Sequence, residues 1–304
     1  MQLLMQPDDG IFPILKAIRK ARRTIDMHIF RLDYKDVEKA LAAAIARGVV
    51  VRTLIAHARA DGEKGLRKLE ERLLAMGATV SRTADDLVRY HGKFMIVDGA
   101  WLFVLAFNLT RRDIDLSRTL GVATRKRILV QEALRLFEAD FDRKPYTGGA
   151  KDFLVSPVNA RERLAAFLKG AKKELLIYDE GITDNAMIRI LQDRVKAGVE
   201  VRIIGKIEKG HDLKAEKYPH TRQHLRCVVR DGRAAFLGSQ SLRKLELDAR
   251  REIGLIVKDA KAVKAITEVF EEDWADTDAG RKARRKAKRE AVADAKREAT
   301  AAGA

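Results

Sequence analysis

The feature that most constrains this chain of 304 residues is an internal repeat. An offset of 150 residues aligns residues 48–52 (GVVVR) with residues 198–202 (GVEVR), and farther along an offset of 133 aligns Asp98-Gly99 with Asp231-Gly232. The difference, 150 − 133, gives the first copy 17 extra residues, which we place around the helical-looking stretch 63–76. A duplication of this kind predicts two similar lobes.

Within each copy, the hydrophobic pattern alternates between helical and strand periods. The first copy predicts helices over 14–21 and 37–47, strands over 24–29 and 49–56, and then a tight hairpin around Asp98-Gly99. The second copy repeats the hairpin around Asp231-Gly232. We therefore predict an α/β fold with two tandem lobes, each a mixed, mainly parallel sheet flanked by helices, related by pseudo-twofold symmetry.

The lobe boundaries follow from the repeat. We assign residues 1–147 to the first lobe, residues 148–280 to the second lobe and residues 281–304 to a basic, alanine-rich tail. Residues 281–298 of this tail carry nine basic and three acidic residues, a net charge of 9 − 3 = +6, which predicts a marginal helix or a disordered arm. The tail is expected either to contact an anionic membrane or nucleic acid electrostatically or to act as a solvated tail that aids solubility.

The whole chain has a formal net charge of +17, which predicts attraction to polyanions without identifying one. No window approaches the roughly 18 consecutive apolar residues that a membrane span needs, so any membrane association is expected to be peripheral, at the inner face. The first residues lack the pattern of a secretory signal, which favours a cytoplasmic protein. The single cysteine, Cys227, excludes an internal disulfide and is expected in the core.

The strongest local signal is His91-Gly92-Lys93, followed after four residues by Asp98 and then by Asn108. Residues two apart on an extended segment project to one face, so the His91 imidazole and the Lys93 ammonium can reach the same phosphoryl group. The return strand of the hairpin can bring Asn108 beside them. Together they offer a nucleophile or acid, a cation and a neutral donor.

The second copy keeps this spacing while some residue identities change. His224-Leu225-Arg226 is followed after four residues by Asp231, and Ser239 and Ser241 stand in the register of Asn108. Two matching sets inside a duplication found on other grounds are far less expected by chance than one isolated match. The two aspartates fit the hairpin turns better than a catalytic role.

These motifs make the chain resemble the phospholipase D superfamily, whose repeated signature is H-x-K-x4-D followed by G-S-x-N, over nearly all of residues 1–276. The resemblance implies two phospholipase D-like lobes whose histidines meet at the lobe interface, one forming a phosphohistidine and the other protonating the leaving alcohol, with no metal and no cofactor. Carried over by position, the implied catalytic residues are His91, His224, Lys93 and Arg226, the implied phosphate-binding residues are Asn108, Ser239 and Ser241, and the implied orienting acid is Glu252. We expect His91 to be the nucleophile and His224 the general acid.

The chain departs from the family pattern at several positions. Leu105-Ala106 replaces Gly-Ser, Ser241 replaces an asparagine, and Thr119 stands where the first copy should carry the counterpart of Glu252. Arg226 in place of lysine keeps the positive charge. Each lost donor can cost about 2–4 kcal/mol of transition-state stabilisation, so the site is expected to be slowed, specialised or retired.

Three functions follow as hypotheses. The first is a phosphodiesterase or phosphatidyltransferase acting on phospholipid, similar to cardiolipin synthases, which carry two motifs in one chain. The second is a metal-independent nuclease acting on DNA or RNA, favoured by the charge of 17 − 6 = +11 left without the tail. The third is a degenerate binder of anionic phosphate ligands. In each case we expect a monomer with an internal pseudo-dimer, taking a phosphodiester as its partner.

Three other histidines are candidates of lesser weight. His28 lies on an apolar strand and is expected to be a core histidine with satisfied hydrogen bonds. His220 precedes a strand pattern and is expected at the surface or behind the site. His57 follows a strand end, where α/β proteins bind ligands, and stays a weak extra candidate.

Overall fold

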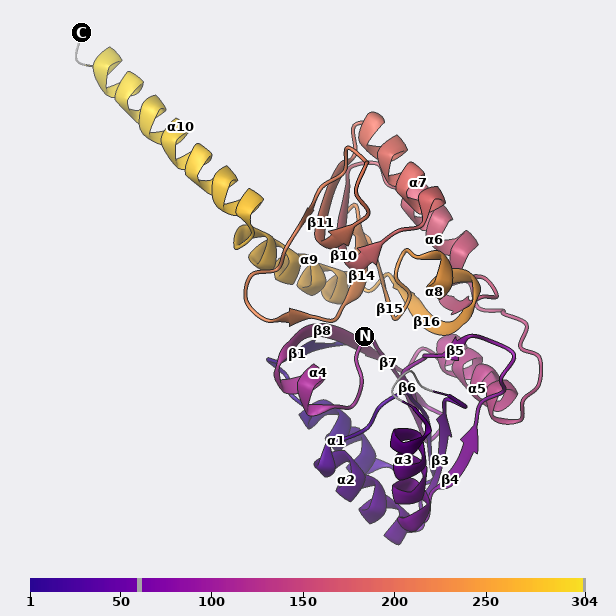
Figure 1. Ribbon diagram of the computed structural model, residues 1–304. Helices are drawn as coiled ribbons and strands as arrows, with labels where there is room; N and C mark the ends of the chain where they lie inside the picture. The colour runs from indigo at the N-terminus through magenta and orange to yellow at the C-terminus, as the bar shows by residue number, and fades with distance from the viewer. Residues whose placement is uncertain (59–61, 303–304) are drawn as a thin grey trace.

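The computed structural model describes residues 1–58 and 62–302, with side chains described as far as residue 293. It contains two lobes, each built on an eight-stranded mixed sheet flanked by helices, with a long helix at the C-terminal end that extends away from both (Figure 1). The predicted two-lobed α/β architecture is confirmed.

The two helices and two strands predicted at the start of the first lobe are present within one or two residues, and further elements that were not predicted surround them. Its elements are β1 (Gln2–Gln6), α1 (Phe12–Lys20), β2 (Thr24–Ile29), α2 (Lys35–Ala46), β3 (Val50–Ile55), α3 (Glu63–Ala75), β4 (Thr79–Arg82), β5 (Arg89–Tyr90), β6 (Phe94–Val97), β7 (Trp101–Leu105), α4 (Arg111–Asp115), β8 (Ser117–Thr124) and α5 (Arg127–Phe141).

The second lobe repeats this order without a counterpart of α3 among the described residues. Its elements are β9 (Phe153–Ser156), α6 (Ala160–Lys169), β10 (Glu174–Ile182), α7 (Asn185–Lys196), β11 (Glu200–Ile207), β12 (Ala215–Glu216), β13 (Arg222–Gln223), β14 (Arg226–Arg230), β15 (Ala234–Gly238), α8 (Lys244–Asp248), β16 (Arg250–Val257), α9 (Ala260–Ala275) and α10 (Asp278–Ala302). Helix α3 lies where the offset change places the extra residues of the first copy.

The sheets are less parallel than the sequence suggests. The first has the order β1-β8-β7-β6-β2-β3-β4, in which only β2-β3 and β3-β4 are parallel pairs along that path. The hairpin strands β6 and β7 and their neighbours pair antiparallel. The sheets are mixed, as expected, but the expectation that most strand pairs are parallel is wrong for the first sheet. Strands joined by tight turns must run in opposite directions.

Each lobe lends one short strand to the sheet of the other. Strand β5, just before His91, pairs parallel with β16, and strand β13, just before His224, pairs parallel with β8. The exchange continues into the motifs, because the backbone N–H of His91 donates to the carbonyl of Arg251 over 2.8 Å and that of His224 donates to the carbonyl of Arg118 over 3.0 Å. The second lobe therefore fixes the first motif, and the first lobe fixes the second.

One hydrophobic core joins the inner faces of the two sheets. It includes side chains of α5 and α9, which lie between the lobes in Figure 1, together with residues of both hairpins, Cys227 among them. The outer face of the first sheet packs against α1, α2 and α3, and that of the second packs against α6 and α7. Burial of this shared core is the main attraction between the lobes.

Two buried ion pairs, which the repeat relates to each other, also cross between the lobes. Arg251 of β16 lies 3.1 Å from Asp140 of α5, and Arg118 of β8 lies 3.2 Å from Asp273 of α9. Burial raises the pKa of Asp140 to about 6 despite the opposing effect of Arg251. Such pairs add little to the net stability, but they align the two lobes, because a displacement that separates the partners leaves a buried charge alone.

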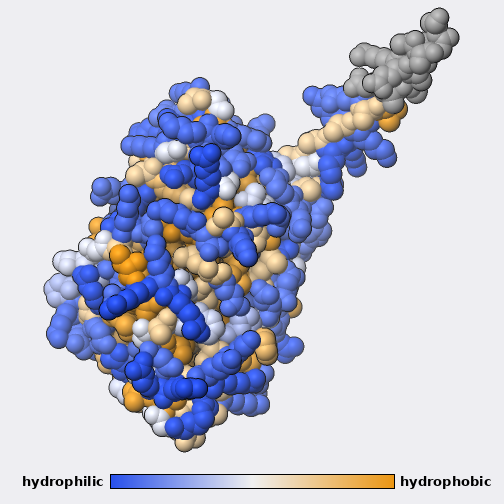
Figure 2. All heavy atoms as spheres, turned by 180° about the vertical axis from the view of Figure 1, so that it is seen from behind, coloured by the Kyte–Doolittle hydropathy of each residue, from blue (hydrophilic) through white to orange (hydrophobic). Residues whose placement is uncertain are grey.

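Helix α10 leaves the second lobe and carries most of the basic tail; residues 303 and 304 of the predicted tail lie outside the described residues. Its side chains from 281 to 293 are exposed. In Figure 2 the base of this arm is covered by hydrophilic side chains interspersed with small apolar ones. No helix in the described ranges is both long and apolar enough to cross a membrane.

The aspartates of the two hairpins have the same structural task. Asp98 and Asp231 both adopt a φ of 54°, in the left-handed region that the turn requires. The Asp98 carboxylate accepts hydrogen bonds from the backbone N–H groups of Arg22, Arg23 and Thr24 at 2.7–3.1 Å, and Asp231 accepts from residues 172–174 in the same way. Each aspartate thereby ties its hairpin to the start of the neighbouring strand.

We predict that Asp98→Ala lowers the free energy of unfolding by about 1–2 kcal/mol, since three backbone donors lose a charged acceptor near solvent. Burial alone would raise the pKa of Asp98, but the backbone donors lower it overall. The stabilisation should therefore be complete above about pH 5 and lost as acid protonates the folded carboxylate. Urea denaturation from pH 3 to 7, with exposed Asp193→Ala as the control, measures both effects; an equal loss in both variants would contradict this assignment.

Candidate functional site

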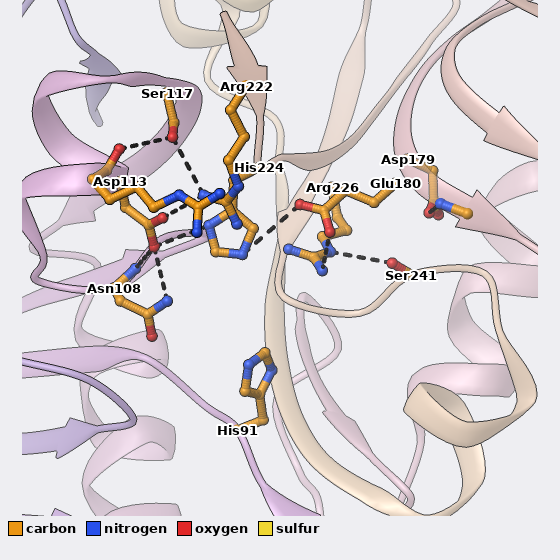
Figure 3. Close-up of polar contacts among 12 residues, drawn as sticks. His91, Asn108, Asp113, Ser117, Asp179, Glu180, Arg222, His224, Arg226 and Ser241 are labelled. Carbon is orange, nitrogen blue, oxygen red and sulfur yellow. Dashed lines mark hydrogen bonds and ion pairs between the residues drawn. The ribbon is translucent and has the colours of Figure 1, made fainter. Parts of the chain in front are cut away.

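The two motifs meet where the lobes exchange strands. Figure 3 shows His91 facing His224 and Arg226 across this interface, with Asn108 and Asp113 on one side and Glu180 and Ser241 on the other. The side chains of His91 and His224 are 12% and 7% exposed, so the site is nearly closed to water while both imidazoles keep some access.

His91 is held by a carboxylate from the other lobe. Its Nδ1 lies 2.9 Å from both carboxylate oxygens of Glu252, a fully buried residue of β16. The Phe30 ring packs edge-on against the imidazole, with ring centroids 4.4 Å apart. With Nδ1 donating to Glu252, Nε2 carries the lone pair and is the nitrogen that can react.

Burial lowers the pKa of His91 well below its usual value, and the nearby charges of Lys93 and Arg226 lower it further. The same effect acts on Lys93, which is 3% exposed: burial lowers its pKa to about 7 against the opposing effect of Glu252. The Lys93 Nζ donates to the His91 carbonyl over 2.7 Å and lies 3.1 Å from both ring nitrogens. The first motif therefore presents a neutral imidazole beside a cation that titrates near neutral pH.

His224 lies against an acid of the first lobe, Asp113 of α4. Its Nδ1 lies 3.0 Å from the Asp113 Oδ2, and Arg222 of β13 donates to the other oxygen over 2.6 Å. Burial alone would raise the pKa of Asp113, but His224 and Asn108 hold it well below its usual range. Burial lowers the pKa of His224, while Asp113 and Glu180 act in the opposite direction. Asp113 and Glu180 thus partly offset the effect of burial at His224, whereas the charges of Lys93 and Arg226 add to the effect of burial at His91.

Arg226 lies almost fully buried at the start of β14. Its Nε donates to the Ser241 hydroxyl over 3.1 Å and its Nη2 donates to the Glu180 carboxylate over 3.1 Å. Its Nη1 is buried with no hydrogen-bond partner in the described part of the chain. A donor left in this state is available to a ligand oxygen.

The three predicted phosphate-binding residues, Asn108, Ser239 and Ser241, each have a different task in the structure. The Asn108 side-chain amide donates to Asp113 over 2.8 Å, so it positions the acid behind His224. Ser241 supports Arg226. The Ser239 hydroxyl exchanges hydrogen bonds with the backbone of Ile253 and lies within the wall of the site, where it stabilises the segment carrying Glu252.

Sequence reasoning missed Asp113 because it sought the counterpart of Glu252 at position 119, and the buried Thr119 hydroxyl has no partner in the described residues. A signal was present, since Asp113 and Glu246 are both acidic and stand 133 residues apart (113 + 133 = 246). Glu180 was missed as well. It lies near the end of β10, and nothing in its spacing points to the motifs.

The remaining histidines lie outside this cluster. His220 is exposed and lies 2.8 Å from Asp276, as expected of a surface residue. Among the hydrogen bonds of the described residues, His57 contacts only Thr83, to which its backbone N–H donates over 3.0 Å and from which its ring Nδ1 lies 3.5 Å. The expectation of a satisfied His28 is wrong: both ring nitrogens are buried without a partner in the described ranges, because the ring is enclosed by Tyr90 and Phe94.

The comparisons with known proteins agree with this geometry. The family model described as "Cardiolipin synthase, PLD-like domain" matches residues 14–141 and 164–274, one segment in each lobe. The chain belongs to this phospholipase D-like family. No curated protein sequence matches it.

Solved structures share the fold. Polyphosphate kinase from Porphyromonas gingivalis aligns over 90% of this chain with a TM-score of 0.76 and 18% identity, and the chain spans 50% of that enzyme. Phosphatidylserine synthase from Haemophilus influenzae Rd KW20 aligns over 90% of this chain and 86% of its own length, with a TM-score of 0.70 and 10% identity. At these identities the likeness shows the two-lobed fold alone.

We predict that Asp113→Asn lowers the pKa of His224 further, because the carboxylate that favours the imidazolium is replaced by a neutral amide. The His224 ring resonances in an NMR titration measure the shift. Asp115→Asn on the same helix, which removes a charge that contacts Tyr34 instead, serves as the control. An unchanged His224 titration in Asp113→Asn would show that this contact does not set its protonation.

Proposed function

We propose that the chain is a phospholipase D-type enzyme that cleaves or transfers a phosphodiester through a phosphohistidine, with phospholipid as its substrate class. The observation that carries this proposal is the pair of nearly buried histidines, one from each motif, each with its Nδ1 within 3.0 Å of a carboxylate from the opposite lobe. Fixing Nδ1 leaves both Nε2 atoms for chemistry on one phosphorus.

The different surroundings of the histidines support separate roles. His91 has cationic neighbours that favour its neutral form, which a nucleophile requires. Burial and the nearby Arg226 charge lower the pKa of His224 as well, but Asp113 and Glu180 oppose this and favour the protonated form that a general acid requires. Two histidines whose charged neighbours differ in this way can hold different protonation states at one pH.

In the proposed first step, the His91 Nε2 attacks phosphorus and forms a P–N bond while the bond to the leaving oxygen breaks and His224 gives that oxygen its proton. In the second step, water or an acceptor alcohol loses a proton to His224 and attacks phosphorus, and the P–N bond breaks. Lys93 and the unpartnered Nη1 of Arg226 are placed to stabilise the phosphoryl oxygens in both steps.

The departures from the family signature carry different weights. The Ser241 hydroxyl accepts from Arg226, so a serine can keep the guanidinium in place where the signature has asparagine. Ala106 is fully buried in the core shared by the lobes, and it offers no donor to the site. The proposed enzyme therefore relies on the two histidines and the two cations more than on side-chain hydroxyls.

We predict that His91→Ala and His224→Ala fail in different ways on bis-p-nitrophenyl phosphate with a chelator present. p-Nitrophenolate leaves without needing a proton, so His224→Ala should still release one equivalent of it in a burst and then stop, with the remaining p-nitrophenyl phosphoryl group held on His91. His91→Ala should give no burst and a rate lower by about 10³-fold or more. Stopped-flow absorbance and ³¹P NMR of the quenched protein follow both.

His220→Ala, which changes an exposed histidine, is the matched control and should turn over normally. A burst in His91→Ala and none in His224→Ala would reverse the proposed roles. Full activity in either variant would end the two-histidine proposal, and an inactive native protein would favour the binder of anionic phosphate ligands.

The basic helix α10 is part of the lipid proposal. Its cations project from the second lobe, and its net positive charge suits an anionic membrane surface, with about 1 kcal/mol for each basic residue near the headgroups. Val292 is half exposed and isolated, so contact would be electrostatic.

We predict that deleting residues 281–304 weakens binding to phosphatidylglycerol vesicles by about tenfold or more at low salt, and that the difference shrinks as salt rises. Vesicle co-sedimentation measures this, with duplex DNA titrated in parallel. Unchanged vesicle binding in the truncated protein would contradict the lipid role of the tail, and loss of DNA binding alone would favour a nucleic-acid partner.

A further inference from the structure

Glu180 occupies a place where the site would be expected to receive an anion. Its Oε2 lies 3.1 Å from the Arg226 Nη2, and its Oε1 lies 3.8 Å from the His224 Nε2, the nitrogen that Asp113 leaves for chemistry. In Figure 3 its carboxylate points toward both Arg226 and His224 of the second motif. A carboxylate and a phosphate present similar oxygens to a guanidinium, so the two compete for it.

The contact is local to the second lobe. The offset of 150 aligns Glu180 with Phe30, whose ring packs against His91 and lies 5.4 Å from the Lys93 Nζ. The first motif thus faces an aromatic ring at the position where the second motif faces a negative charge. Glu180 therefore adds a negative charge beside the second motif, and the first motif has no charge at the corresponding position.

The carboxylate of Glu180 is not enclosed. Its side chain is 26% exposed and lines a pocket of about 280 Å³, beside Lys206 and Lys217. Both lysines are exposed, and neither forms an ion pair among those of the described residues. A rotation of Glu180 toward this pocket would exchange its contact with Arg226 for the neighbourhood of these two cations.

We propose that Glu180 is a specificity-determining residue that disfavours dianionic phosphates, such as free phosphate and phosphomonoesters, and admits the monoanion of a phosphodiester. The inference rests on the proposed function, since it concerns the same phosphate position. A dianion placed against Arg226 and His224 is repelled by the Glu180 charge about twice as strongly as a monoanion at the same distance. The Nη1 of Arg226 and the Oε1 of Glu180 are both buried without a hydrogen-bond partner in the described residues. A phosphate oxygen bound to this Nη1 would therefore lie near the Glu180 charge.

The test measures binding without turnover. Native protein, Glu180→Gln and Glu208→Gln are titrated calorimetrically at pH 8 with inorganic phosphate, which is mainly dianionic there, and with dimethyl phosphate, a monoanionic diester. We expect Glu180→Gln to bind phosphate about tenfold more tightly than native protein and to bind dimethyl phosphate only about threefold more tightly. Glu208→Gln, which removes an exposed charge from the region just after β11, should match native protein.

Equal gains for both ligands in Glu180→Gln, equal gains in the two variants, or no anion binding in any of the three proteins would overturn the inference. Thermal unfolding checks the fold, and Glu180→Ala replaces Glu180→Gln if the latter is unfolded. The outcome is separable from the proposed function. A native protein that turns over nothing but whose Glu180→Gln variant gains phosphate affinity would keep this inference and refute the enzyme.

Discussion

The reciprocal exchange of β5 and β13 is the constraint on which the site depends. Each exchanged strand is only two residues long, and each ends at the backbone of a motif histidine that is hydrogen-bonded to the other lobe. The imidazoles are therefore placed by sheet backbone, which leaves little freedom to move. The lobes cannot separate without losing these bonds, the shared core and the buried Arg251–Asp140 and Arg118–Asp273 pairs.

Burial of the charged side chains around the histidines shifts their pKa values and lowers the stability of the fold. Lys93, Arg226 and Glu252 are almost fully removed from water, and each would be costly to bury alone. They are tolerated because opposite charges and hydrogen bonds surround them, yet burial still lowers the pKa of Lys93 to about 7. A site that keeps several charges out of water is one in which a phosphate can recover much of that cost.

Much of the fold could be predicted from the sequence, because the repeat and the apolar periods of β2, β3 and the hairpins are local signals. The strand exchange could not, since β5 and β13 are too short to show an alternating pattern. The motif residues could be named from their spacing. The repeat marks Asp113 only as an acid with an acidic counterpart, and it does not mark Glu180 at all. Neither role could be assigned, because each acid contacts a histidine more than 40 residues away in the chain and contributed by another element.

Duplication explains why the frame is symmetric, and three pairs of positions explain why the site is not. The repeat aligns Phe30 with Glu180, Thr119 with Glu252, and Asp113 with Glu246. In every aligned pair the two residues make different contacts in the structure. Glu246, for instance, pairs with Arg250 and leaves histidine contact to Asp113. The backbone needed to bring two motifs together is thus kept in both copies, while side chains at the interface have diverged. The mechanism that we propose needs one neutral and one protonated histidine, and this divergence at the charged positions is what allows the two halves of a duplicated site to act differently.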